Sequence, residues 1–304
     1  MPGSVRIVEV GPRDGLQNER VPVSVEVKVE FIRRLAESGL RTIEAGSFVS
    51  PKRVPQMADT AEVLRRLPAD TAVRYPVLVP NLRGMEDALA AGAGEVSVFA
   101  SASETFSHRN IGCSIAESIE RFRPVLELAK ANAIAVRGYV SCVLGCPYEG
   151  GVAARAVSGV SRQLAELGCY EIALGDTIGI GTPRLARDVV HAVAGEIGIG
   201  TVAVHFHDTR GQALANILAC LEEGVTVVDG AAAGLGGCPY APGASGNVST
   251  EDLVFMLEGM GVRTGVDLGL AIDAGRFICT HLGRADGSKV AQATGSQGDP
   301  RQAM

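Results

Sequence analysis

Short aliphatic runs alternate with amphipathic stretches along most of the chain. The runs have the length and the β-branched composition of buried strands, and the stretches between them repeat apolar residues at helical spacing. The sequence predicts eight strands, at 5–10, 42–45, 73–79, 95–100, 133–143, 170–174, 201–204 and 225–229.

A helix is predicted in each interval between these strands. Ser24 is an N-cap candidate, Thr182 precedes a proline at a first helical position, and Ser114 forms a capping box with Glu117. The predicted helices cover 24–39, 56–67, 82–91, 114–131, 152–167, 182–197 and 212–223, and we expect a polar loop at 101–113.

Strict alternation of strand and helix favours a parallel sheet covered by helices. Eight such units match the closed (β/α)8 TIM barrel, which typically takes about 250 residues. The alternative is an open doubly wound sheet. Against it, the first strand–helix turn lacks Gly-x-Gly-x-x-Gly, and the chain has no Walker-type glycine loop. We therefore expect an α/β TIM barrel.

Two more helices, at 251–260 and 268–282, are predicted after the eighth strand. The chain has no evident linker or low-complexity stretch. We expect one catalytic TIM-barrel domain over 1–304, with extra C-terminal helices at about 250–290 and a flexible tail from about 294.

The composition excludes several classes of protein. With 46% hydrophobic and 20% charged residues, the chain is globular rather than disordered. Its net charge of -6 gives no basic field for nucleic acid or an anionic membrane, and no apolar run reaches the ~18 residues of a membrane span. The 7 cysteines are odd in number and form no secreted disulfide framework, which indicates free thiols and a cytoplasmic location.

The most informative chemistry lies at the end of the seventh strand. His205 and His207 are two residues apart, so their side chains point to the same face of a strand. One interpretation is a pair of satisfied polar residues. We favour a half-built metal site, because imidazole is the commonest side-chain metal ligand. Asp208 should point to the other face and is left out.

Polar residues also follow the other strands, and in a barrel these positions meet at the catalytic rim. Those of interest are Arg13, Asp14, Glu44, Ser47, Ser103, Glu104, His108, Arg109, Asn110, Arg137, Tyr139, Asp176, Cys238 and Asn247. Asp14, His205, His207 and Asn247 together offer two nitrogens and two oxygens. Such a set suits Mg²⁺ or Mn²⁺, with Zn²⁺, Co²⁺ and Fe²⁺ as alternatives.

The glycine-rich loop at 234–247 carries Cys238. It is either a long surface loop or a segment that bends over a ligand and presents the thiol. The sequence favours neither interpretation over the other.

Several motifs resemble those of 3-hydroxy-3-methylglutaryl-CoA (HMG-CoA) lyases, within the metal-dependent lyase and synthase barrels. They are VGPRDGLQNE at 10–19, EAGSFVSPK at 44–52, GDTIG at 175–179, HFHDT at 205–209 and the cysteine loop at 234–247. The resemblance covers about 5–294 and departs from some members at Ala173 and Arg20. It also departs from animal members in the tail, which lacks their organelle-targeting tripeptide and late cysteine.

The resemblance implies cleavage of (S)-HMG-CoA, an acyl-CoA, to acetyl-CoA and acetoacetate, a step of leucine degradation and ketone-body metabolism. It implies a divalent cation held by Asp14, His205, His207 and Asn247, and a homodimer. It also implies that Glu44 steadies Asn247, that Cys238 is a catalytic thiol and that Asp176 and His205 take part in proton transfer. Arg13 would stabilise the enolate.

Other functions stay open at this stage. The nearest is a lyase for a related thioester with a different substituent at C3. An aldolase or condensing synthase on the same scaffold would lack the Gly-Gly-Cys-Pro-Tyr loop. A binding module without catalysis would not need the full set of reactive residue types.

Overall fold

The computed structural model describes residues 1–68, 72–238 and 241–295, and of residues 238 and 241–244 it describes the backbone alone. Eight parallel strands form one sheet in the order β1-β8-β7-β6-β5-β4-β3-β2. They are β1 (Arg6–Glu9), β2 (Gly46–Ser47), β3 (Val77–Leu78), β4 (Glu95–Ser101), β5 (Ala135–Ser141), β6 (Glu171–Asp176), β7 (Val202–Phe206) and β8 (Val227–Gly230).

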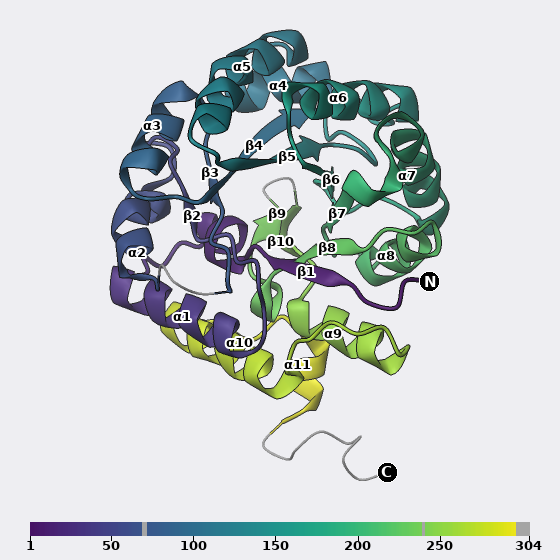
Figure 1. The fold of residues 1–304 in the computed structure, drawn as a ribbon. Coiled ribbons are helices and arrows are strands. Elements are labelled where there is room, and N and C mark those ends of the chain that lie inside the picture. Colours follow the sequence, from purple (N-terminus) through teal and green to yellow (C-terminus); the bar gives the residue numbers. More distant parts are fainter. Residues whose placement is uncertain (69–71, 239–240, 296–304) are drawn as a thin grey trace.

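Backbone hydrogen bonds join the two ends of this sheet. Glu9 N donates to Thr42 O at 2.9 Å, and Glu44 N donates to Glu9 O at 2.8 Å. The strands therefore curl into a ring with helices on its outer side, as Figure 1 shows. This confirms the predicted (β/α)8 barrel.

The strands of the sheet are shortest at β2 and β3. The strands predicted here, at 42–45 and 73–79, are longer than the observed ones. Thr42 and Ile43 contribute single bridges rather than a ladder. Within the third run, Pro76 has no N–H to give to a neighbouring strand, although its carbonyl accepts from Ala45. The ladder is therefore interrupted here.

Helices follow the strands in the predicted order: α1 (Val25–Glu37), α2 (Thr60–Arg66), α3 (Leu82–Ala90), α5 (Ile115–Ala131), α6 (Ala154–Leu167), α7 (Pro183–Ile197) and α8 (Ala213–Glu222). The predicted caps are present. Ser24 accepts from Val27 N, Thr182 accepts from Leu185 N, and the capping box of Ser114 is complete.

The predicted polar loop at 101–113 is wrong, because it contains α4 (Glu104–Ile111). Ser103 caps this helix by accepting from Phe106 N at 3.1 Å, and Gly112 ends it in a left-handed conformation with φ 71°. α4 buries only Phe106 and Ser107, so it has no apolar stripe that a periodicity argument could detect.

The chain after β8 forms a hairpin and three helices. The hairpin strands are β9 (Gly237–Cys238) and β10 (Ala241–Ser245), and the helices are α9 (Thr250–Gly259), α10 (Leu268–Leu282) and α11 (Lys289–Ala293). The last helix was not predicted. α10 lies beside α1 outside the ring (Figure 1), with the Arg34 guanidinium 4.4 Å from the centre of the Phe277 ring.

These helices agree with the predicted C-terminal extension, whereas the single-domain interpretation stays a prediction. The predicted flexible tail falls mostly on 296–304, outside the described residues. In the part of the chain that is described, no helix is both long and apolar enough to span a bilayer.

Candidate metal centre and active site

A cavity of about 540 Å³ opens among the loops that follow the strands. Its polar lining includes Arg13, Asp14, His205 and His207, and its apolar lining includes Leu78, Phe99, Phe122 and Val140. The site residues therefore lie at the carboxyl ends of the strands, as expected for a barrel of this kind.

A tight π-helical turn after β1, Gly11–Gly15, presents Arg13 and Asp14. The backbone N–H groups of Arg13, Asp14 and Gly15 all donate to the single carbonyl of Val10, at 3.2, 2.7 and 3.1 Å. Such turns are rare and are often found at functional sites. This turn places two consecutive charged side chains at the cavity.

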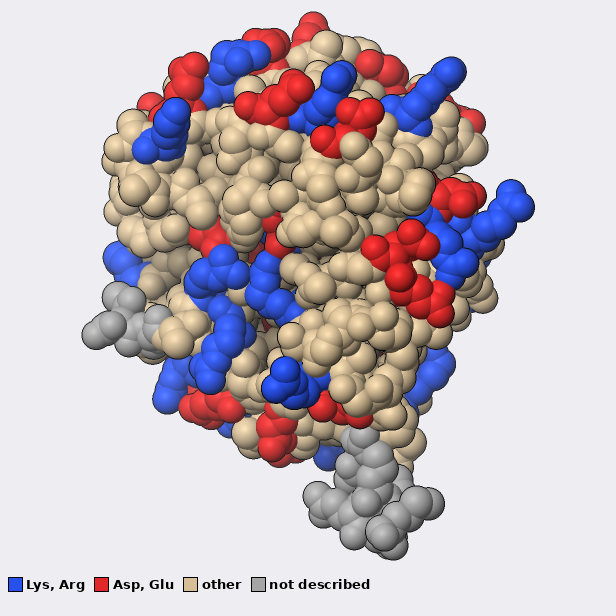
Figure 2. Space-filling view, turned by 45° about the vertical axis from the view of Figure 1, so that its right-hand side comes forward, with Lys and Arg blue, Asp and Glu red and all other residues tan. Residues whose placement is uncertain are grey.

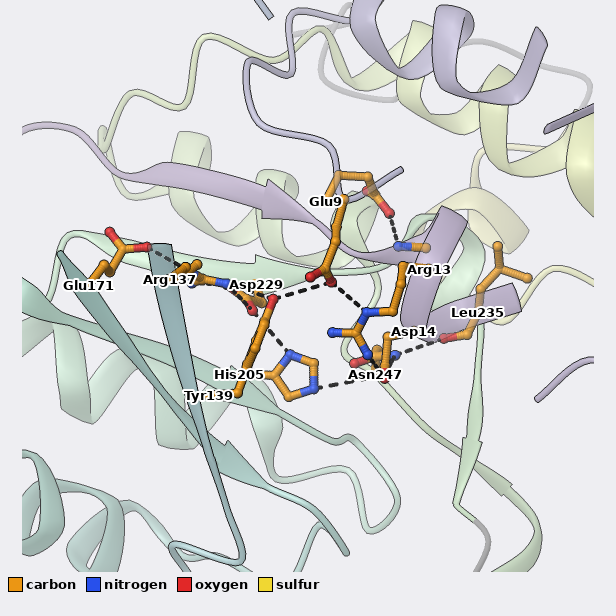
Figure 3. Close-up of polar contacts among 12 residues, drawn as sticks. Glu9, Arg13, Asp14, Arg137, Tyr139, Glu171, His205, Asp229, Leu235 and Asn247 are labelled. Carbon is orange, nitrogen blue, oxygen red and sulfur yellow. Dashed lines mark hydrogen bonds and ion pairs between the residues drawn. The ribbon is translucent and has the colours of Figure 1, made fainter. Parts of the chain in front are cut away.

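Three of the four predicted metal ligands form one cluster. One donor atom each of Asp14, His205 and His207 lies within 4.8 Å of the others. Asn247 stands beside them: its Nδ2 donates to Asp14 Oδ2 at 2.9 Å and its backbone pairs with that of His207. Figure 3 shows Asp14, His205 and Asn247 converging from three separate segments.

The two imidazoles differ in the surroundings of their Nδ1 atoms. Asp229 Oδ2 lies 3.1 Å from His205 Nδ1. Burial opposes ionisation of Asp229, but Arg137 and His205 hold its pKa well below the usual range, so an ionised carboxylate stands beside His205 Nδ1. His207 Nδ1 is buried without a hydrogen-bond partner, and burial with the neighbouring His205 lowers the pKa of His207 to about 4.

These observations fit a divalent cation. Neutral imidazoles and an ionised carboxylate are the forms that bind metal. Burial alone would raise the pKa of Asp14, but Arg13 and the two imidazoles outweigh it and lower that pKa to about 2. The buried Nδ1 of His207 has no hydrogen-bond partner, and a buried polar atom of this kind is common at sites that hold an ion.

Arg13 is fixed by two carboxylates. Its Nε donates to Glu44 Oε2 at 2.6 Å, and its Nη1 donates to Asp14 Oδ1 at 2.5 Å. Burial would lower the pKa of Arg13, but Glu44 and Asp14 raise it, so the guanidinium keeps its charge while it lines the cavity. Glu44 also accepts from the Tyr139 hydroxyl at 3.3 Å. Glu44 was expected to steady the Asn247 amide, but its hydrogen bonds go to Arg13 and Tyr139 instead.

The two remaining predicted catalytic residues are Asp176 and Cys238. Asp176 is fully buried at the end of β6, where its carboxylate accepts from Ile180 N at 3.2 Å and Gly181 N at 2.9 Å. Burial raises the pKa of Asp176. It therefore stabilises the following turn and does not line the cavity. Cys238 belongs to β9 by its backbone, and its side chain lies outside the described residues.

Sequence reasoning did not single out Asp229, which it treated only as a strand residue. The available signal was a carboxylate at the end of a mostly aliphatic strand that should be buried on both faces. Arg137 and Tyr139 were noted on the fifth strand without a partner. In the structure, Arg137 donates to Asp229 at 2.9 and 2.7 Å and to the Tyr139 hydroxyl at 2.8 Å.

The fold and this cluster define a parallel (β/α)8 barrel with a candidate divalent-metal site at the carboxyl ends of its strands. Comparison with known proteins then places the chain more narrowly. The HMGL-like family matches residues 4–278, and the chain belongs to that family.

Curated relatives and solved structures agree with this assignment. The chain is 59% identical to a Gallus gallus protein named hydroxymethylglutaryl-CoA lyase, mitochondrial, over 96% of this chain and 98% of that one. It is similar to the crystal structure of hydroxymethylglutaryl-CoA lyase from Pseudomonas aeruginosa, with TM-score 0.95, 55% identity and coverage of 96% and 98%. An HMG-CoA lyase from Acinetobacter baumannii, in complex with coenzyme A and 3-methylmalate, matches with TM-score 0.92, 38% identity and coverage of 98% of both chains.

Proposed function

We propose that this protein is an HMG-CoA lyase, which cleaves (S)-3-hydroxy-3-methylglutaryl-CoA to acetyl-CoA and acetoacetate with the help of a divalent cation. The observation that carries the proposal is the cluster of Asp14, His205 and His207 beside Arg13 at the cavity, in a chain that shares 59% identity with a protein of that name.

Asp14, His205, His207 and Asn247 would hold the cation. Asn247 uses its Nδ2 toward Asp14 and toward Leu235 O, which leaves Oδ1 as its donor for a metal. The oxygen ligands suit Mg²⁺ or Mn²⁺, which we propose, and the two imidazoles keep Zn²⁺, Co²⁺ and Fe²⁺ as alternatives. When bound, such a cation polarises the substrate hydroxyl and lowers its pKa.

Arg13 supplies the second electrostatic element. The thioester side of the substrate becomes an enolate as the carbon–carbon bond breaks, and negative charge develops on its oxygen. A fixed, buried guanidinium stabilises such charge, and one well-placed donor is worth about 3–4 kcal/mol. Glu44 holds Arg13 through its Nε and thereby orients it toward the cavity.

Proton transfer needs an acceptor for the hydroxyl proton and a donor for the enolate carbon. We assign the donor role to Cys238, because a thiol with a pKa near 8.5 is a competent acid at neutral pH. His205 and Asp176 are the two candidates for the acceptor. His205 Nδ1 is engaged with Asp229, so His205 can accept a proton only at Nε2 and only while that nitrogen is not bound to the cation; Asp176 would have to release the turn that it holds.

The remaining expectations about the protein are part of the same proposal. The acyl-CoA is the substrate partner, and leucine degradation and ketone-body metabolism are the setting of the reaction. Among the described residues the cysteines are free and buried, in keeping with a cytoplasmic enzyme. We infer a homodimer, which light scattering can test. On the face drawn in Figure 2, basic and acidic side chains are interspersed, apart from one cluster of basic side chains beside a hollow. This face therefore has no long basic stripe of the kind that binds nucleic acid.

A panel of thioesters tests the proposal. Purified protein with Mg²⁺ or Mn²⁺ should release acetyl-CoA and acetoacetate in equal amounts from HMG-CoA. Faster turnover of a thioester with a longer substituent at C3 would favour the related lyase, and pyruvate release from a 4-hydroxy-2-oxoacid would favour the aldolase. Asp14→Asn, which removes one ligand charge with little change in shape, serves as the matched inactive control.

A further inference from the structure

Asp229 makes contacts that its place in a strand does not require. It lies in β8, is 1% exposed, and its Oδ2 faces both His205 Nδ1 at 3.1 Å and Arg137 Nη1 at 2.9 Å. Its Oδ1 accepts from Arg137 Nη2 at 2.7 Å. Both oxygens of one carboxylate are therefore occupied by donors, and one of these donors belongs to a candidate metal ligand.

We propose that Asp229 is the positioning residue of the metal centre. It fixes the His205 ring and keeps the proton on Nδ1, so that Nε2 faces the cation, while Arg137 fixes Asp229. This inference rests on the metal site of the proposed function and adds the residues that set its geometry. A carboxylate accepts hydrogen bonds only, so the ring nitrogen that faces it must donate.

Arg137 is itself held firmly enough to fix the position of Asp229. It is almost fully buried, its Nε donates to Glu171 Oε1 at 2.7 Å, and its Nη1 also donates to the Tyr139 hydroxyl. Together with the two bonds to Asp229, the guanidinium is held from three sides (Figure 3). Because a guanidinium is planar and a carboxylate matches its fork, the pair allows little rotation of Asp229.

The same contacts continue to the other side of the site. The Tyr139 hydroxyl donates to Glu44, which accepts from Arg13, and Arg13 donates to Asp14. Asp14 Oδ2 then lies 3.9 Å from His205 Nε2, which closes a ring of polar groups that includes two of the candidate metal ligands. Tyr139 also packs edge-on against the His205 ring, with 5.6 Å between ring centres. Asp14 and His205 are thus positioned by one connected network.

Asp229→Asn tests the proposal with almost no change in volume. An amide has one accepting and one donating end, whereas Asp229 accepts at both. If the amide oxygen faces His205, the NH₂ group opposes Arg137. If the oxygen faces Arg137, the NH₂ group requires a bare Nδ1 and moves the proton to Nε2, where it blocks the ligand lone pair. Either arrangement should disturb the site.

The measurement is Co²⁺ binding to metal-free protein, followed by visible absorption, with thermal unfolding recorded in parallel. We expect Asp229→Asn to bind about 10–100-fold more weakly, the range typical when the partner of a metal-bound histidine is lost. Excess metal should restore much of the turnover. Glu171→Gln is the matched control, because it alters a buried partner of the same guanidinium whose hydrogen bonds go to Arg6 and Arg137 rather than to His205. Its Co²⁺ affinity should change less than about 3-fold.

Unchanged Co²⁺ affinity in folded Asp229→Asn would overturn the proposal, and so would an equal loss in Glu171→Gln. A measurement on the wild-type protein does not depend on whether variants fold. In ¹⁵N-histidine-labelled, metal-free protein, His205 should carry its proton on Nδ1, and a proton on Nε2 would contradict the assignment. Both tests are independent of substrate, so a failure to cleave HMG-CoA would count against the proposed function alone.

Discussion

Glu9 is a buried carboxylate that connects two loops of the site. It is 0% exposed; its Oε1 accepts from Gly11 N at 2.8 Å and Ala232 N at 2.9 Å, and its Oε2 accepts from Thr250 Oγ1 at 2.6 Å. Burial raises the pKa of Glu9 from 4.5 to about 7, and these hydrogen bonds only partly oppose the rise. We predict that Glu9→Gln stabilises the protein at alkaline pH.

The size of the effect follows from the pKa. A carboxyl group that binds its proton more tightly in the folded state stabilises the fold below pH 4.5, and loses that stabilisation as pH rises through about 7. The shift from 4.5 to about 7 corresponds to about 3 kcal/mol. Glutamine keeps an oxygen for the two backbone donors and offers an NH₂ group to the threonine hydroxyl, so it avoids this loss.

Urea unfolding of metal-free protein, followed by circular dichroism from pH 5 to pH 8.5, measures the effect. The contribution of His207 to stability depends on pH in the opposite direction. Its pKa is about 4 in the folded protein, below the usual 6.5, so the free energy of unfolding falls as pH drops from 6.5 toward 4. This contribution is common to both proteins and cancels in their difference. The free energy of unfolding of Glu9→Gln relative to wild type should rise with pH by up to about 3 kcal/mol. A difference that does not vary with pH would refute the reasoning.

The other predictions concern catalysis and packing. Arg13→Met should lower kcat by about 100–1,000-fold while Mn²⁺ affinity falls less than about tenfold; equal losses would mean that Arg13 mainly organises the metal site. Cys238→Ala should bind substrate but turn over at least ~100-fold more slowly in a steady-state assay, and near-normal turnover would remove the thiol from the mechanism. Gly275→Ala should destabilise the protein by about 1–3 kcal/mol, because the added Cβ would lie 2.5 Å from Glu251 Oε1. Gly159→Ala, on an open face of α6, should instead stabilise it by about 0.5–1 kcal/mol in the same thermal unfolding assay.

Local patterns were sufficient for the barrel and for part of the site. The spacing of His205 and His207 follows from the two-residue period of a strand, and Asp14 follows a strand that ends at the same rim. These features depend on neighbours in sequence and on one general property of the fold. Their convergence in the structure therefore agrees with the sequence-based expectation.

Long-range polar contacts were beyond such reasoning. Arg137 and Asp229 are 92 residues apart and meet only because β5 and β8 line the same barrel. The orientation of Asp176 depends on the tight turn that follows it: a Cβ at Gly181 would lie 2.8 Å from its Oδ2, so only glycine brings that N–H close to the carboxylate. Neither contact can be predicted from the spacing of apolar and polar residues along the chain.

The central claim is that a cation held by Asp14 and the two imidazoles enables cleavage of HMG-CoA. The most direct test is the rate of acetoacetate release by protein stripped with a chelator and then titrated with Mn²⁺. We predict negligible release from the stripped wild type, full recovery with Mn²⁺, and no comparable recovery for Asp14→Asn. Undiminished release by the stripped protein, or wild-type recovery of Asp14→Asn, would contradict the account.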